Sequence, residues 1–163
     1  MKVGFTGTQE KLSVTQFDLL AMIISELTEM TEAHHGDCIG ADITFHILVE
    51  DTRPDVAIHR HMPENTTKQA KYSTCNVLPY VDYEPKPYLE RNHDIVDACD
   101  VLIACPRTLE EELRSGTWAT VRYARNTGKP VAIIWKDGKY TYENKSDTKL
   151  GKAKKDENEA QEI

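Results

Sequence analysis

Small residues, two threonines, a serine and an arginine are gathered in the segment RSGTWAT at residues 114–120. This segment lies between an apolar run at residues 101–105 and a stretch with helical spacing at residues 121–125. A small-residue turn that opens a helix after a buried strand presents unpaired backbone N–H groups, which bind anions. The types and order of these residues therefore indicate a site for a phosphate, to which Arg114 could add a charge-assisted hydrogen bond.

Two further small-residue turns follow apolar segments that are typical of strands. One is GTQ at residues 7–9, after a strand candidate at residues 2–6, and the other is GDCIGAD at residues 36–42. Taken singly, each turn could merely reverse the chain, and Thr117 could merely cap its helix. Ligands of open α/β sheets bind beyond the carboxyl ends of the strands, so three such turns together predict one anion or nucleotide site.

Asp37 and Asp42 are the acidic residues that we expect in this site. Asp37 could bind a ribose hydroxyl or act as a general base, and it is our candidate catalytic residue. Asp42 is equally well explained as a carboxylate in the first turn of a helix, where negative charge is favoured. With His46 it forms only a weak i, i+4 metal signal. The other histidines considered offer no convincing ligand set: His34, His35, His59 and His61.

Three other segments have both a functional and a structural interpretation. Arg91 and Asn92 could reach a base or ribose, or could lie in a solvated turn. Trp118 could stack on a base or belong to the core, and Glu112 is most simply part of a solvated loop. The residues that we predict to bind the ligand are Thr6, Gly7, Thr8, Gln9, Gly36, Asp37, Gly40, Ala41, Asp42, Arg91, Asn92, Arg114, Ser115, Gly116, Thr117 and Trp118. We expect no metal and no cofactor.

The elements that must position these residues alternate along the chain. We expect strands at residues 2–6, 33–38, 56–61, 101–105 and 131–135. We expect helices at residues 17–27, after a capping box formed by Ser13 and Gln16, and at residues 40–53, 88–99 and 117–126. This alternation predicts an α/β protein, a Rossmann-like three-layer sandwich with a mostly parallel sheet of about five strands.

Two stretches have no clear place in that pattern. Residues 64–87 lack periodicity and contain three prolines, and a stretch of this length is usually functional or an excursion over the active face. After a turn at Asp137 and Gly138, residues 139–143 could form one hairpin return. We expect residues 1–138 to be one nucleotide-binding domain and residues 139–163 to be a polar, largely disordered tail.

The composition of the chain limits the kinds of partner that it could bind. The chain has 163 residues, enough for one domain, and a net charge of −7. From Lys136 onward the chain has seven basic and seven acidic residues, so residues 1–135 carry the whole net charge of −7. This negative charge argues against nucleic acid as the main partner. The four cysteines lack paired spacing, which favours a reduced, cytoplasmic setting. No signal peptide is visible, and no apolar run approaches the roughly 20 residues of a membrane span.

Taken together, the motifs GFTGT, HHGDCIGAD, KPYLERN, IVDACD and RSGTWATVRYAR resemble the Smf/DprA–LOG (SLOG) superfamily of Rossmann-like nucleotide-binding domains. The resemblance is greatest to small bacterial and phage members and covers roughly residues 1–138. It implies that residues 6–9, 36–42, 91–92 and 114–118 line a nucleotide-type pocket. Relatives in the superfamily often pair, so a homo-oligomer stays an open alternative.

The LOG-type members of this superfamily are phosphoribohydrolases with a catalytic glutamate three residues after a Gly-Thr pair. Here the matching position is Thr120, which has no carboxylate. We therefore predict binding of a nucleotide or nucleotide-derived molecule, for sensing or sequestration. The alternative is a nucleotide N-glycosidase or deoxyribosyltransferase-like enzyme that uses Asp37 or Glu112 as its acid. DNA processing of the DprA kind is the least supported, because residues 1–135 carry the net negative charge.

Overall fold

Strands and helices alternate through residues 1–70 and 80–145, the part of the chain that the computed structural model describes. The strands are β1 (Lys2–Gly7), β2 (Glu32–His35), β3 (Ala57–Pro63), β4 (Tyr80–Lys86), β5 (Val101–Cys105), β6 (Val131–Ile134) and β7 (Tyr140–Glu143). The helices are α1 (Val14–Glu26), α2 (Ala41–Thr52), α3 (Tyr88–Ala98) and α4 (Gly116–Thr127), with a short 3-10 helix η1 (Thr66–Lys68).

The strands form one sheet in the order β4-β3-β2-β1-β5-β6-β7. All neighbouring pairs are parallel except β6 and β7, which are antiparallel. The chain moves outward from β1 to β4 and then returns to place β5 on the other side of β1. In doubly wound sheets the ligand crevice lies at such a reversal, beyond the carboxyl ends of the two strands.

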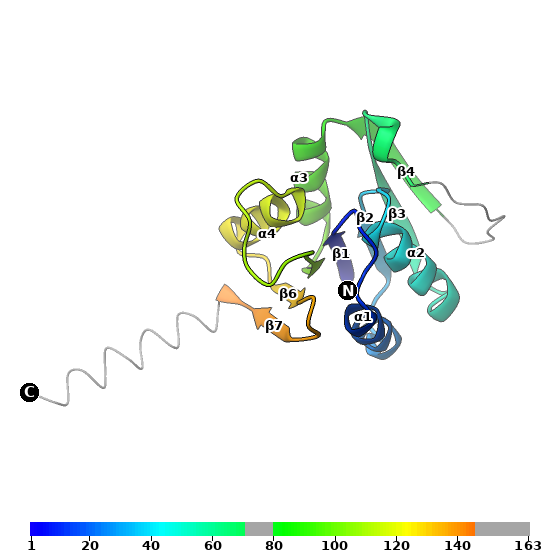
Figure 1. The fold of residues 1–163 in the computed structure, drawn as a ribbon. Coiled ribbons are helices and arrows are strands. Elements are labelled where there is room, and N and C mark those ends of the chain that lie inside the picture. The colour runs from blue at the N-terminus through cyan, green and yellow to red at the C-terminus, as the bar shows by residue number, and fades with distance from the viewer. Residues whose placement is uncertain (71–79, 146–163) are drawn as a thin grey trace, which may run out of the picture.

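Helices cover both faces of the sheet (Figure 1). α1 and α2 pack on one face over a core that includes Phe5 and Phe45, whose rings stack with centroids 4.4 Å apart. α3 and α4 pack on the other face over a second core around Trp118 and Leu102. The apolar runs of β5 and β6 are buried from both sides, as expected for strands between two helical layers.

The capping box at the start of α1 is confirmed. Gln16 N donates to Ser13 Oγ at 3.1 Å, and Ser13 N donates to Gln16 Oε1 at 3.2 Å. The buried Gln16 amide also donates to the carbonyl oxygens of Pro106 at 2.8 Å and Ile134 at 3.0 Å. This one side chain therefore starts α1 and holds the chain at the ends of β5 and β6.

The Rossmann-like, mostly parallel α/β prediction is confirmed, but the sheet has seven strands instead of about five. The predicted hairpin return is β7, so the sheet continues past residue 138. The unpredicted strand is β4, inside the stretch without periodicity. It is an exposed edge strand that contains Pro85, so it carries no apolar alternation. The predicted disorder of the tail falls mostly on residues 146–163, which lie outside the described residues.

Within residues 1–70 and 80–145, no helix is both long enough and apolar enough to cross a membrane.

Candidate functional site

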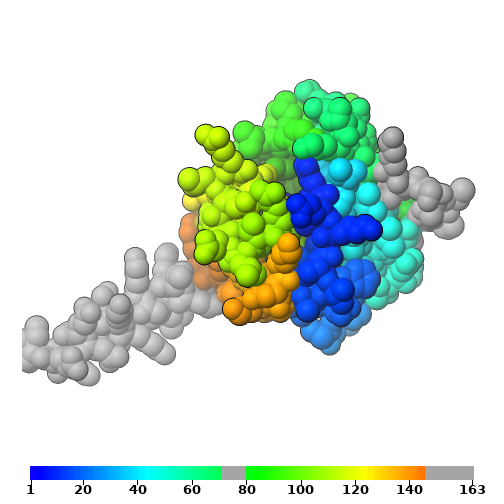
Figure 2. Space-filling model, viewed as in Figure 1, coloured from blue at the N-terminus to red at the C-terminus, as the bar shows by residue number. Residues whose placement is uncertain are grey.

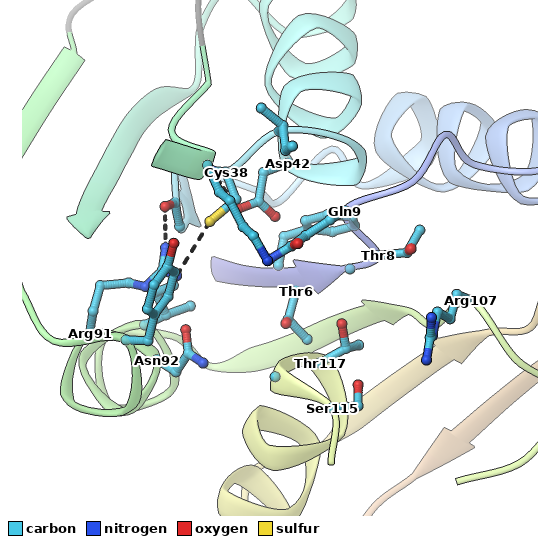
Figure 3. Close-up of a pocket in the computed structure, with 18 of the residues that line it drawn as sticks. Thr6, Thr8, Gln9, Cys38, Asp42, Arg91, Asn92, Arg107, Ser115 and Thr117 are labelled. Atoms are coloured by element: carbon cyan, nitrogen blue, oxygen red, sulfur yellow. Dashed lines mark hydrogen bonds between the residues drawn. The ribbon is translucent and has the colours of Figure 1, made fainter. Parts of the chain in front are cut away.

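A cleft of about 730 Å³ opens at the reversal of strand order, beyond β1 and β5. Its walls come from five segments: the turn after β1, residues 36–42, η1, the first turns of α3, and the loop that leads into α4. In Figure 3, labelled side chains of the turn after β1, of residues 36–42, of α3 and of the loop that leads into α4 lie around the shared opening. Segments far apart in sequence therefore meet at one place, as the strand-end motifs predict.

The N-terminus of α4 is open toward this cleft. Ser115 caps the helix by accepting from Trp118 N at 3.4 Å. Within the described part of the chain, the backbone N–H groups of Gly116 and Thr117 have no hydrogen-bond partner. A Cβ added at Gly116 would meet no described atom within 4 Å. Two donors at the positive end of a helix thus face empty space, which suits an anion.

The N-terminus of α2 is packed more tightly, and its first N–H group is used by the protein itself, although Asp42 N and Ile43 N have no hydrogen-bond partner among the described residues. Ala41 N donates to Thr8 O at 2.9 Å, and Ile39 N donates to Lys68 O at 2.9 Å. Gly40 has φ +87°, and a Cβ there would overlap the backbone of Gln9. Ala41 is fully buried, with Gly7 packed so closely that a Cβ on Gly7 would lie 2.5 Å from the Ala41 Cβ. The small residues here serve packing.

Basic side chains outnumber acidic ones around the cleft, although the whole chain is acidic. Arg114 and Lys68 are exposed at its rim, and neither makes an ion pair within residues 1–70 and 80–145. Figure 2 shows the loop between β5 and α4 (yellow-green) beside the start of the chain (blue). Arg107 Nη1 in this loop lies 3.9 Å from Glu10 Oε1 in the turn after β1. The basic lining residues are Lys68, Arg91, Arg107 and Arg114, and the acidic ones are Glu10 and Asp42. Four cations against two acids favour an anionic ligand.

The loop that carries Arg107 and Arg114 is braced against α4. Arg122 donates to Glu111 Oε1 at 3.1 Å and to Leu113 O at 3.1 Å. Arg125 donates to the other Glu111 oxygen at 2.8 Å. The loop and the helix N-terminus are therefore held together before any ligand arrives.

Arg91 is a buried cation at the base of the cleft, only 4 % exposed. Its Nη1 donates to the carbonyl oxygens of Gly36 and, at 3.2 Å, His61, and its Nη2 donates to Cys38 Sγ at 3.5 Å. The guanidinium occupies the space that a side chain at Gly36 would need. Its Nε has no hydrogen-bond partner among the described residues. Arg91 thus joins the end of β2 to α3 and brings positive charge under the cleft.

Asp42 is the carboxyl group of the cleft that could exchange a proton. It is 6 % exposed and accepts a hydrogen bond from Cys38 N at 3.1 Å. Burial raises the pKa of Asp42 to about 6, against the opposing attraction of Arg91. A carboxyl group with this pKa can be protonated or ionised close to neutral pH, which is what acid–base chemistry requires.

Asp37, the candidate catalytic residue, does not line the cleft. It is 1 % exposed and adopts φ 54° at the turn after β2. Gln69 Nε2 donates to its Oδ2 at 2.8 Å, and Ala70 N donates to its backbone oxygen at 2.8 Å. Asp37 therefore fastens the segment after η1.

The structure divides the other predicted residues into two groups. Lining the cleft are Thr6, Gly7, Thr8, Gln9, Gly36, Asp42, Arg91, Asn92, Arg114, Ser115, Gly116 and Thr117. Gly40, Ala41 and Trp118 lie outside the lining, like Asp37. Trp118 is buried in the core and packs on Trp135, with ring centroids 5.5 Å apart. The position of Trp118 therefore supports its interpretation as a core residue.

Several lining residues were absent from the sequence-based set. They are Phe5, Glu10, Cys38, Ile39, Asn65, Thr67, Lys68, Tyr88, Leu89, Ile95 and Arg107. Asn65, Thr67 and Lys68 come from the aperiodic stretch, whose length already suggested an excursion over the active face. Cys38 and Ile39 lie inside a motif that we did select, whereas Arg107 carried no signal beyond its place after a strand.

The position of the LOG glutamate and the alternative acid Glu112 also lie outside the cleft lining. Thr120, at the LOG glutamate position, is 1 % exposed, and its hydroxyl donates to Gly116 O at 2.9 Å. Glu112 lies outside the lining and accepts two hydrogen bonds from Arg107, at 3.1 and 3.0 Å. In the weak metal pair of Asp42 and His46, one imidazole nitrogen is already used, because His46 Nδ1 bonds to His35 Nε2 at 2.9 Å.

No family model and no curated protein matches the sequence. Solved structures do match. DprA from Streptococcus pneumoniae has a TM-score of 0.60 and 19% identity, over 82% of this chain and 50% of that chain. A molybdenum cofactor binding protein from Rippkaea orientalis has a TM-score of 0.58 and 20% identity, over 83% of this chain and 77% of that chain.

A further match is DNA processing protein A from Helicobacter pylori, whose structure was described for its single-stranded DNA binding mode. It has a TM-score of 0.56 and 20% identity, over 82% of this chain and 64% of that chain. This chain thus spans about half to two thirds of the two DprA chains. Identities this low establish a shared fold and nothing beyond it. This chain therefore shares the Rossmann-like α/β fold of these proteins.

Proposed function

We propose that the cleft binds a phosphate-bearing small molecule of the nucleotide class, for sensing or sequestration. The observation that carries this proposal is the open N-terminus of α4. Gly116 and Thr117 offer two backbone donors without protein partners among the described residues, at a position where no described side chain competes for the space. Residues 1–138 form the proposed binding domain, to which β7 adds an edge.

Charge and size support the same ligand class. Arg114 and Lys68 stand at the rim without ion-pair partners among the described residues, so they are available to a phosphate. The volume of about 730 Å³ lies within the usual range for small-molecule sites. Tyr88 and Asn92 of α3 form another part of the lining and offer a ring and an amide to a base or sugar. A nucleotide with its phosphate at the N-terminus of α4 and its base toward α3 would contact both walls of the cleft.

Isothermal titration calorimetry with adenosine 5′-monophosphate, adenosine and inorganic phosphate tests the proposal. We expect Gly116→Ala to weaken binding of the monophosphate about tenfold or more, because the added methyl group would crowd a phosphate held by the N–H groups of Gly116 and Thr117, and loss of one charge-assisted hydrogen bond has that magnitude. The matched control is Val14→Ala, which changes the exposed first residue of α1. Equal affinity in Gly116→Ala and the parent, with every phosphate compound tried, would contradict the proposal.

A second candidate function is N-glycosidic bond cleavage or deoxyribosyl transfer. One observation favours it: Asp42 lines the cleft with a pKa raised by burial to about 6. Asp42, and not Asp37, is then the acid to test. Incubation with a nucleotide panel, followed by chromatography for free base, should show release by the parent chain and none by Asp42→Asn. Absence of base release by the parent leaves binding as the function.

Single-stranded DNA is a third ligand to examine, because the H. pylori match was described for binding it. The net charge of −7 and the confined cations of the cleft argue for a single nucleotide over a strand. Fluorescence anisotropy with labelled oligonucleotides decides between them. Competition by adenosine 5′-monophosphate would place both ligands in the same cleft.

A further inference from the structure

A second group of polar side chains lies on the α3-facing side of the sheet, away from the cleft lining. Glu32 and His34 are two residues apart on β2, so their side chains share one face, and His59 lies directly opposite His34 on β3. The ligand atoms of these three side chains lie within 4.8 Å of one another. Strand register thus brings together an acid and two imidazoles that are up to 27 residues apart in sequence.

We propose that Glu32, His34 and His59 bind one divalent ion of the zinc class, with Glu32 Oε2 and the two Nε2 atoms as ligands. Glu32 Oε2 accepts a hydrogen bond from His34 Nε2 at 3.0 Å, whose proton the ion would displace, and lies 3.7 Å from His59 Nε2. In a tetrahedral zinc site, ligand atoms about 2.1 Å from the ion lie roughly 3.4 Å apart, which falls between these two separations. Imidazole nitrogens select zinc and its neighbours over calcium or magnesium.

The opposite nitrogen of each imidazole ring is already held. His34 Nδ1 bonds to His61 Nε2 at 3.0 Å, and His59 Nδ1 bonds to Tyr83 Oη at 3.0 Å. His61 in turn stacks on the Tyr83 ring, with centroids 4.3 Å apart. Metal-binding histidines typically donate their second ring N–H to such a partner, which fixes the tautomer and the ring orientation. Both rings therefore direct Nε2 toward Glu32, where the ion would lie.

Access and charge around the three ligands are also suitable. His34 is nearly buried, whereas the Glu32 side chain is 26% exposed and that of His59 is 13% exposed, so an ion can enter from solvent. The His34 and His59 rings are stacked at 4.3 Å with an interplanar angle of 26°, so binding of one ion by both Nε2 atoms requires the more exposed His59 ring to tilt. Lys2 Nζ lies 3.3 Å from the other oxygen of Glu32 and opposes the ion by its charge.

Titration of the full chain with zinc chloride, followed by calorimetry and by metal analysis after gel filtration, tests the site. We expect one equivalent to bind the parent chain and to raise the melting temperature. His59→Gln and Glu32→Gln should each weaken binding at least tenfold, as loss of one ligand requires. Tyr83→Phe should weaken it by a smaller factor. Cobalt(II) in place of zinc should give visible bands without a thiolate charge-transfer band, since no thiolate is a ligand.

Lys2→Gln provides a test that does not depend on removing a ligand. Lys2 is half-exposed, so the variant should fold, and an ion on Glu32 must bind more tightly when this cation is removed. His93→Ala is the matched control, because His93 is exposed and stacks on Tyr123 outside the cluster. Arg114→Ala should bind zinc as the parent does, which separates this site from the cleft. No saturable binding by the parent, or unchanged affinity in Lys2→Gln and His59→Gln, would overturn the proposal.

Discussion

The N-termini of α4 and α2 follow the same kind of sequence but differ in how closely the protein packs against them. Each follows a strand and begins with glycine and small residues. At α4 two backbone donors face open space beside Arg114. At α2 the donors of Ile39 and Ala41 are used by Lys68 and Thr8. Small residues at a strand end therefore indicate that some group approaches the backbone closely. Only the three-dimensional structure shows whether that group is a ligand or another part of the protein.

The largest effect that we expect comes from exchanging glycine for alanine at the two helix starts. Gly40→Ala must accept a left-handed φ and an overlap with the Gln9 backbone, so it should lose about 2 kcal/mol or more of unfolding free energy. Gly116→Ala should stay within about 0.5 kcal/mol of the parent, because its methyl group enters open space. Urea denaturation of both variants measures this, and equal stabilities would remove the contrast between the two helices.

Arg114 should contribute the next largest effect, on affinity alone. Its exposed guanidinium has no ion pair among the described residues, so Arg114→Gln should fold normally and bind adenosine 5′-monophosphate about tenfold more weakly. The salt dependence of binding should also decrease, because one phosphate contact is lost. Lys139→Gln, at an exposed turn outside the cleft lining, is the matched control. Equal losses in both variants would mean that general charge, and not the open helix start, attracts the ligand.

Asp42 should make anion binding depend on pH. Burial raises its pKa to about 6, so the group is ionised above and neutral below that pH. A neutral group no longer repels an anion, so sulfate should bind severalfold more tightly as pH falls from 7.5 to 5, on the order of a few tenths to one kcal/mol for screened charges. Sulfate itself does not titrate in this range. Calorimetry of Asp42→Asn should show a flat profile, and a profile like that of the parent would assign the titration elsewhere.

The smallest effect should come from the cap of α4. Ser115→Ala removes one side-chain acceptor at 3.4 Å and should lose about 0.5 kcal/mol. Ser13→Ala breaks the capping box of α1 and a hydrogen bond to Lys136 O at 2.8 Å, so it should lose about 1 to 2 kcal/mol. Thermal unfolding of the two variants should show this order. The reverse order would mean that α4 depends on its own cap for its open N-terminus.

The sequence predicts the parts of this fold that have a strong apolar period. β1, β5, β6 and the four helices lie close to their expected positions, and the capping box of α1 is visible as Ser13 and Gln16. β4 was not predicted, because an exposed edge strand that contains a proline has no regular apolar period. The expectation that ligands bind beyond the carboxyl ends of parallel strands then located part of the cleft lining, since it depends only on the order of the elements.

What sequence could not provide is the identity of distant partners. From the sequence, Asp37 is a candidate to bind a ligand. In the structure it instead accepts hydrogen bonds from Gln69 and Ala70, some 32 residues later in the chain. Ala41 looks like part of a phosphate cradle until Thr8 accepts its N–H. His34 and His59 show no ligand spacing, because only the register of β2 on β3 brings them together. Pairings of this kind depend on strand register and loop geometry, which local patterns do not contain.

The braced loop before α4 has a consequence for the kinetics of binding. Arg122 and Arg125 hold Glu111, so the segment between β5 and α4 is ordered in advance and little conformational entropy is lost when a ligand arrives. Association should then proceed in one step, at a rate that electrostatic attraction increases and added salt decreases. Differences in affinity among nucleotides should consequently appear in how long each one stays, and not in how fast each one arrives.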